Sequence, residues 1–150
     1  MAIWQFDLSL VPCGGPMPSR TSDGHESPSV GAERVVEAKA WLSARFGEPW
    51  EMLDGWLIYG PTDGSRVDLV LDQDGTAEIG ARIDARGEAT EFIESLCELS
   101  ELLDCSLFAV EFWQPIEAKS AAIAIALERS RVAAFIRDPK KVLKGAGSDA

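Results

Sequence analysis

The sequence has a single histidine, His25, and three cysteines, Cys13, Cys97 and Cys105. A structural zinc site needs a closed set of cysteine and histidine ligands, and no CxxC pair occurs here. An odd and sparse set of cysteines is also untypical of the disulfide framework of a small secreted domain. Cys97 falls in a helical apolar pattern and Cys105 opens a strand-like run, so we interpret both as small buried hydrophobic residues.

Long hydrophobic runs are also missing. No apolar stretch approaches the roughly 18 residues of a membrane-spanning helix. The N-terminus has no basic region, and Asp7 interrupts its apolar stretch, so no signal peptide is expected. Together with the cysteine usage, these features predict a protein of the reducing cytoplasm that does not bind membranes.

Motifs of enzyme chemistry are scarce. Gly14-Gly15-Pro16 matches neither GxGxxG nor a Walker sequence, and no nucleophile elbow is present. A small hydrolase using His25 is an alternative that no supporting spacing accompanies. Asp72-Gln73-Asp74-Gly75 is similar to the middle of a calcium loop, but the terminal positions would be Val70 and Ala81, which carry no ligand atoms. We therefore expect a protein that is not an enzyme and needs neither metal nor cofactor.

Basic residues are few: 14 Lys and Arg stand against 25 Asp and Glu, giving a net charge of −11. The acidity is local, because residues 51–111 hold three basic and fifteen acidic side chains, a net charge of −12. Residues 112–150 carry seven basic and four acidic side chains, a net charge of +3. Such a balance disfavours nucleic acid and anionic membranes as main partners and leaves basic partners open.

What the sequence does have is the composition of a globular chain, with 46% hydrophobic residues over 150 positions. This length predicts one domain covering residues 1–150. Hydrophobic periodicity predicts strands, a hairpin and helices, separated by a long loop at 12–31 and followed by a flexible tail at 144–150. The predicted strands are residues 3–11, 56–59 and 105–112, the hairpin is 66–84, and the helices are 31–46, 87–103 and 116–137.

Individual patterns define the faces of these elements. In the first strand, Trp4, Phe6, Leu8 and Leu10 alternate with polar residues, and Pro12 closes it. The first helix has an apolar stripe, a cap at Ser27 or Ser29, and an end at Gly47 and Pro49. The strand predicted at residues 105–112 is expected to be central in the sheet, because residues 107–110 are continuously apolar. The stripe residues are Val35, Ala38, Leu42 and Phe46 in the first helix, and Phe92, Leu96, Leu99 and Leu103 in the second.

The hairpin has a predictable register. A two-residue Asp74-Gly75 turn would pair Leu71 with Glu78 and mismatch the two faces. A three-residue loop at 73–75 pairs Leu71 with Ala77 and Leu69 with Ile79, with glycine in the left-handed bulge position. The resulting order β-α-β-β-β-α-β-α predicts an α+β fold, with a mostly antiparallel sheet and helices packed on one face. A ferredoxin-like arrangement is one option.

The acidic residues form two sequence groups. On the hairpin they point away from the apolar side, and Arg82 is the one cation expected to reduce their mutual repulsion. On the second helix they form a stripe on the side opposite the apolar stripe. Like charges on neighbouring strands destabilise the free protein, and a basic protein would relieve that cost. We therefore predict a partner-binding surface, although a solvated helix face is the alternative for the helical group. The predicted partner-binding residues are Asp68, Asp72, Glu78, Asp84, Glu91, Glu94, Glu98 and Glu101.

The last predicted helix has more apolar surface than one sheet contact requires. One face carries Ile116, Ile123, Leu127 and Ala134, and a second carries Ala121, Ile125, Val132 and Ile136. The second face predicts either packing beneath the long loop or a homodimer contact. The basic residues at the end of this helix and beyond it are not interpreted as a nucleic-acid site, because the C-termini of helices favour cations in any case. They are Arg129, Arg131, Arg137, Lys140, Lys141 and Lys144.

Two segments carry a resemblance. Residues 3–12, IWQFDLSLVP, and residues 127–139, LERSRVAAFIRDP, resemble small immunity proteins encoded beside bacterial polymorphic or contact-delivered toxins. The resemblance implies a small, acidic, cytoplasmic α+β protein that blocks a toxin by tight binding, and the charge argument predicts that this toxin is basic. It supplies no site residue. The alternative is a bacterial structural or adaptor domain that self-associates through its last helix.

Overall fold

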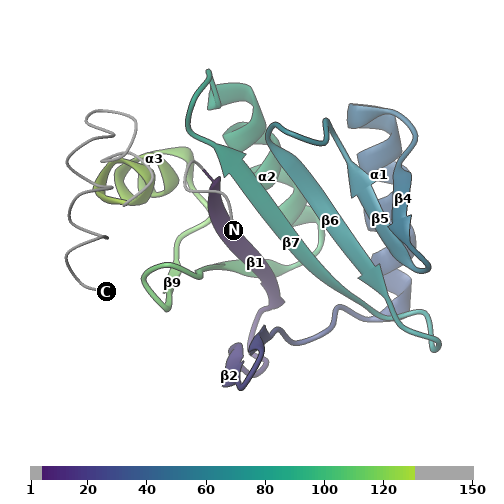
Figure 1. The fold of residues 1–150 in the computed structure, drawn as a ribbon. Helices are drawn as coiled ribbons and strands as arrows, with labels where there is room; N and C mark the ends of the chain where they lie inside the picture. Colours follow the sequence, from purple (N-terminus) through teal and green to yellow (C-terminus); the bar gives the residue numbers. More distant parts are fainter. Residues whose placement is uncertain (1–4, 131–150) are drawn as a thin grey trace.

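The computed structural model describes residues 5–130 of the chain. Seven strands form one antiparallel sheet, and a separate two-stranded hairpin stands at its lower end (Figure 1). In spatial order the sheet consists of β4 (Trp50–Leu53), β5 (Trp56–Tyr59), β6 (Arg66–Leu71), β7 (Ala77–Asp84), β1 (Gln5–Pro12), β8 (Cys105–Ala109) and β9 (Gln114–Ile116). The hairpin is β2 (Ser19–Thr21) with β3 (Gly24–Glu26), and the helices are α1 (Ala32–Phe46), α2 (Thr90–Leu102) and α3 (Ser120–Arg129).

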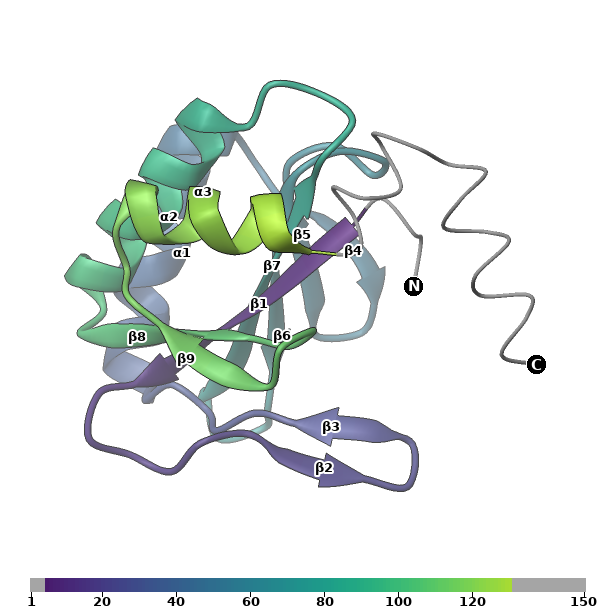
Figure 2. The ribbon, with the colours of Figure 1, turned by 90° about the vertical axis from the view of Figure 1, so that its left-hand side faces the viewer.

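The predicted α+β class is confirmed. The inner strands follow the order β6-β7-β1-β8, with α1 after β1 and α2 connecting β7 to β8. This is the β-α-β-β-α-β arrangement of a ferredoxin-like core. Strands β4 and β5 extend the sheet on one side, and β9 extends it on the other. Figure 2 shows the helices on one side of the sheet, with α3 lying beside α2.

Strand β1 alternates as predicted. Phe6, Leu8 and Leu10 are buried in the core between the sheet and the helices. They face Ile83, Ala81 and Ile79 of β7 in an antiparallel register. Because side chains alternate with a period of two, Asp7 and Ser9 are placed on the opposite face, away from the helices. Trp4, which was predicted to share the apolar face, lies outside the described residues.

The predicted hairpin register is confirmed. Leu71 pairs with Ala77 and Leu69 with Ile79, around a tight turn in which Gly75 has φ of +87°. The positive φ favours glycine because an L side chain would crowd the backbone there. The two-residue alternation of side chains therefore selects the three-residue loop. A shift of the pairing by one residue would turn every apolar side chain of one strand to the wrong face.

Helices α1 and α2 follow their predicted apolar stripes. Val35, Ala38 and Leu42 are buried on α1, which ends at Gly47 with φ of +86°. The predicted caps are wrong, because Gly31 occupies the N-cap position without a side-chain hydrogen bond. Ser27 is engaged elsewhere, its hydroxyl donating to Ser9 Oγ at 2.9 Å.

The predicted 12–31 loop is wrong in part, because it contains the β2–β3 hairpin. Its two strands are short and fully exposed, so they leave no pattern of alternating burial in the sequence. The hairpin packs against Trp113. The Trp113 and His25 ring centroids are 5.8 Å apart, and Arg20 Cζ lies 4.4 Å from the Trp113 ring centroid. Strand β4 was also missed, since three of its four residues are exposed.

The last third of the chain differs from its prediction. Ile116 pairs with Leu107 in β9, so α3 begins at Ser120 and not at residue 116. The chain becomes extended at Ser130, and the predicted continuation to Arg137 lies outside the described residues, as does the predicted tail at 144–150. Strand β8 ends at Ala109, before the predicted residue 112. The predicted central position holds only in that β8 is not an edge strand: it is second from one edge, between β1 and the short β9, and Leu107, Phe108 and Ala109 are buried.

Candidate functional site

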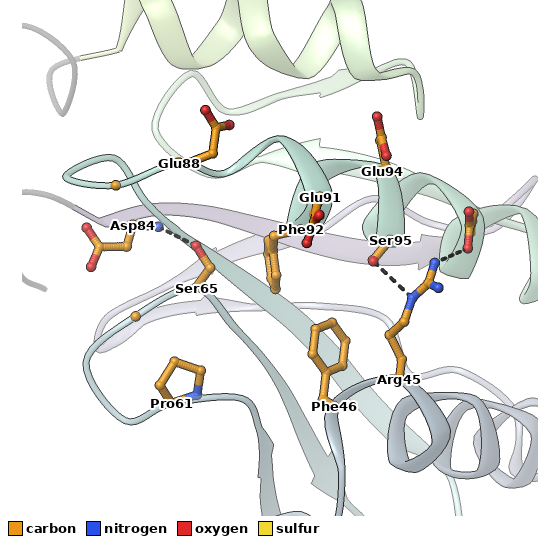
Figure 3. A pocket seen from close by; sticks show the side chains of 13 residues that line it. Arg45, Phe46, Pro61, Ser65, Asp84, Glu88, Glu91, Phe92, Glu94 and Ser95 are labelled. Carbon is orange, nitrogen blue, oxygen red and sulfur yellow. Dashed lines mark hydrogen bonds and ion pairs between the residues drawn. The ribbon is translucent and has the colours of Figure 1, made fainter.

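A groove of about 860 Å³ lies between the C-terminal end of α1 and the N-terminal half of α2 (Figure 3). Two aromatic rings form its apolar base, Phe46 from α1 and Phe92 from α2, with ring centroids 5.9 Å apart. We call this the acidic groove because five carboxylates line it: Asp84, Glu88, Glu91, Glu94 and Glu98.

Helical spacing places three of these carboxylates. Glu91, Glu94 and Glu98 follow the i, i+3, i+7 pattern, so they share one face of α2. All three side chains are exposed, as predicted, while Phe92 between them is buried. Glu88 precedes the helix, where its Oε1 accepts a hydrogen bond from the Thr90 backbone N–H at 2.8 Å.

The carboxylates of the groove differ in their partners. Glu98 forms an ion pair with Arg45, whose Nε also donates to Ser95 Oγ at 3.1 Å. Asp84 pairs with Arg86 at 2.7 Å, and the hydrogen bond from Arg86 holds the pKa of Asp84 below its ordinary value. In residues 5–130, Glu91 and Glu94 form no ion pair. Because their charge is not neutralised by a neighbouring cation, it is available to a partner.

The hydrogen bond from the Thr90 side chain also lowers the pKa of Glu88, with a smaller contribution from the Thr90 backbone. Glu88 is therefore ionised at neutral pH, which matches the preference of a helix N-terminus for negative charge. The groove thus combines an ionised rim with an aromatic base. Such a site can accept a cationic group together with an apolar one.

The structure does not bring all eight predicted partner-binding residues together. Four of them line the acidic groove: Asp84, Glu91, Glu94 and Glu98. Asp68 and Glu78 lie on the face of the sheet opposite α1, α2 and α3. We call it the helix-free face because no helix within residues 5–130 covers it. Asp72 is exposed beside the β6–β7 turn, and Glu101 is exposed further along α2, outside the groove lining.

The prediction that Arg82 alone relieves the acidic hairpin is wrong. Asp68 lies 3.0 Å from Arg66 Nε and accepts a hydrogen bond from Trp56 Nε1 at 3.1 Å. Glu78 accepts one from the Ser27 backbone N–H at 2.8 Å. These carboxylates are therefore stabilised within the protein.

A second polar cluster occupies the helix-free face of the sheet and was not predicted. Asp7 of β1 lies 3.4 Å from Arg82 Nε of β7. Burial raises the pKa of Asp7, an effect that Arg82 reduces and nearby Asp68 adds to. A small cavity of about 160 Å³ opens beside this pair, and His25 contributes to its lining. The only sequence signal was the presence of charged residues in mid-strand positions.

The groove also contains residues that sequence patterns did not identify as functional. Arg45 and Phe46 come from the end of α1, and Glu88 comes from the loop before α2. Their proximity depends on how α1 and α2 pack, which no local periodicity reveals. Phe46 and Phe92 were predicted only as core residues.

The hydrolase alternative receives little geometric support. His25 contacts Trp113 by its ring, and among the described residues it forms no hydrogen bond to a serine, threonine or cysteine. Within residues 5–130 no three His, Cys, Asp or Glu side chains are grouped so as to hold a metal ion. No helix in that range is long and apolar enough to cross a membrane.

Cys13 is exposed, Cys97 is half-buried and Cys105 is buried, and all three are free thiols. Burial raises the pKa of Cys105 to about 11, which makes it a poor nucleophile. The interpretation of Cys105 as a small buried hydrophobic residue is therefore confirmed. No protein-family model, curated protein or solved structure matches the chain.

Proposed function

We propose that the protein is a non-enzymatic binding protein that captures a basic protein in the acidic groove, as an immunity-type inhibitor of a toxin. The observation that carries this proposal is the pair Glu91 and Glu94. Both are exposed on the groove rim without an ionic partner in the described part of the chain, and both stand beside the aromatic base formed by Phe46 and Phe92.

The groove chemistry fits a cationic partner for two reasons. Carboxylates gathered on one rim accelerate the encounter with a basic surface. An aromatic base provides apolar area for a side chain that follows the cation into the groove, as in the anchor positions of tight complexes. The resemblance to immunity proteins adds the kind of partner, a toxin, and the cytoplasmic location that such inhibition requires, while the acidic rim supports a basic toxin.

Two charge-matched variants test the proposal. Glu91→Lys/Glu94→Lys reverses the groove rim, and Asp72→Lys/Glu101→Lys makes the same change in net charge at exposed positions outside it. Wild type and both variants serve as baits for basic proteins at about 0.1 M salt, with elution at about 0.5 M where screening is strong. Circular dichroism checks that each bait is folded.

We expect a basic protein that wild type and the outer variant retain and that the groove variant loses. With that protein purified, the groove variant should associate at least tenfold more slowly, since steering depends on local charge. Equal retention by both variants would contradict the proposal. A toxin-like reading frame beside the gene and neutralisation of its product by the wild-type chain would establish the immunity function.

Self-association through the last helix is a second candidate. Ile125 of α3 is 50% exposed, whereas Ile123 on the same helix is fully buried. In that case Ile125→Glu should convert a dimer into a monomer in sedimentation without unfolding the chain. The companion residue Val132 lies outside the described residues.

A further inference from the structure

The small cavity on the helix-free face of the sheet is separate from the acidic groove. We call it the sheet-face cavity, and the side chains that matter to it are Asp7, Ser9, His25, Asp68 and Arg82, together with the gap at Gly80. Strand register brings them together: Asp7 faces Arg82, Ser9 faces Gly80, and Gly80 faces Asp68 on its other side. The β3 residue His25 adds one wall.

The Asp7 carboxylate, which lines the cavity, has an acceptor without a partner in the described residues. Within residues 5–130, Asp7 Oδ1 is buried without a hydrogen bond, and its contact with Arg82 Nε is 3.4 Å long. Burial raises the pKa of Asp7, so Arg82 does not compensate fully for the loss of water. Asp68 has closer partners: its Oδ2 accepts hydrogen bonds from Trp56 and Arg66, while its Oδ1 has only the ion-pair contact with Arg66 Nε at 3.0 Å. Asp7 lines the cavity, so a ligand N–H group bound there would add a hydrogen bond to this under-solvated carboxylate.

The cavity also has donors with spare capacity. Arg82 contacts Asp7 through Nε, and its side chain is 32% exposed. The guanidinium has five N–H donors, so most of them are left for a ligand or water. His25 contacts Trp113 edge-on, and within residues 5–130 its ring nitrogens form no hydrogen bond. The cavity thus brings together an acidic group and basic groups that still have hydrogen-bonding capacity.

The charges of the cluster balance. Asp7 and Asp68 are opposed by Arg82 and Arg66. A lone cation or a lone anion would upset that balance, while a ligand bearing both charges would preserve it. We propose that the sheet-face cavity binds a small zwitterion of the α-amino acid class, with its ammonium at Asp7 and its carboxylate at Arg82 and His25.

Size restricts the ligand. At about 30 Å³ per water molecule, a cavity of about 160 Å³ holds about five waters. Glycine and alanine have a similar number of non-hydrogen atoms, so they can replace this water and return its hydrogen bonds. A bulky side chain fits only if it points out through the opening.

Gly80 provides a direct test of the cavity. It does not have a positive φ, and the nearest atom to a Cβ built there is the Leu8 carbonyl oxygen at 3.6 Å, an ordinary contact. Gly80→Ala is therefore compatible with the backbone. Its methyl group lies on the same face as Ser9 and Asp68 and occupies part of the cavity.

The binding experiment uses the full chain at pH 7 and L-alanine as the probe, followed by amide NMR shifts and calorimetry. Ethylammonium and propionate are the matched half-ligands, since each keeps one of the two charges. We expect alanine to bind at least tenfold more tightly than either. Gly80→Ala, Asp7→Asn and Arg82→Gln should each weaken alanine at least tenfold, while Asp72→Asn on the same hairpin should have no effect.

Three results would overturn the proposal. The first is no binding of alanine at about 20 mM, well above the millimolar Kd expected for so small a ligand. The second is ethylammonium or propionate binding as tightly as alanine, which would make the cavity a site for one charge only. The third is unchanged binding in Gly80→Ala that retains wild-type amide spectra elsewhere. None of these results bears on the acidic groove.

Discussion

The acidic groove and the helix-free face of the sheet both carry carboxylates, but the surroundings of those carboxylates differ. On the groove rim, Glu91 and Glu94 are exposed and have no ion pair within residues 5–130. On the sheet face, Asp68 is 13% exposed and pairs with Arg66, which is 5% exposed. A carboxylate thus serves a structural role in one region and is available to a partner in the other. Net charge counted along the sequence does not separate these roles.

The largest expected effect comes from breaking the buried pair on the sheet face. Asp68→Asn keeps the shape of the side chain but leaves the Arg66 guanidinium buried without its counter-charge. Removing one partner of a buried ion pair costs about 3–5 kcal/mol of unfolding free energy. Urea denaturation at pH 7 measures this loss.

The control for that change replaces both partners. Arg66→Met/Asp68→Leu leaves no charge buried, so it should recover most of the stability that Asp68→Asn loses. A cost below about 1 kcal/mol for the single substitution would mean that water reaches Arg66. The carboxylates of the sheet face would then contribute no more to stability than the exposed carboxylates of the groove.

These two regions also show what the sequence can and cannot predict. The β6–β7 register and the exposed face of α2 follow from periodicity within one segment, so both were predictable. The pairing of Asp7 with Arg82 depends on which strands become neighbours, and these residues lie 75 positions apart in the chain. The groove likewise forms only because the end of α1 packs beside α2, which no pattern within one segment predicts. Short exposed strands such as β2 and β3 bury too little to leave a pattern.

The Arg66–Asp68 pair is a different case. The two residues stand two positions apart on one strand, so their shared face could be read from the sequence. Their burial could not, because it depends on which strand becomes the neighbour of β6, and β5 takes that place with Ile58 opposite Asp68. Trp56 of β5 donates a hydrogen bond to Asp68 Oδ2. Charge patterns therefore predict orientation, while tertiary packing decides whether a charge is neutralised.

A smaller effect is expected at Asp84, which lies at the end of β7 and also lines the groove. Arg86 donates to Asp84 through its side chain and through its backbone N–H, and it also donates to the Asp63 carbonyl at 2.8 Å. In Arg86→Gln the pKa of Asp84 should rise toward its ordinary value, because the charged hydrogen bonds that lower it are lost. Carboxyl carbon shifts in an NMR titration measure this change.

The pH dependence of stability follows from the same pair. Because folding lowers the pKa of Asp84, its ionised form stabilises the fold above the ordinary pKa of about 3.9. That contribution is lost as the pH falls through the folded pKa. The gap in urea midpoint between wild type and Arg86→Gln should therefore be widest above about pH 5 and should close in acid. A gap that widens in acid would contradict this assignment.

The smallest effect is expected at the groove rim. Glu94→Gln removes one charge from an exposed helix position that has no ion pair within the described residues, so the unfolding free energy should change by less than about 0.5 kcal/mol. Neighbouring Glu91 and Glu98 repel Glu94 along the same helix face, so the change should be toward greater stability. Urea denaturation at low salt, where this repulsion is least screened, measures the difference. A loss of 1 kcal/mol or more, beyond the about 0.5 kcal/mol typical of exposed positions, would show that Glu94 has a structural partner. The rim would then resemble the sheet face, and the proposal that it is kept free for a basic partner would fail with it.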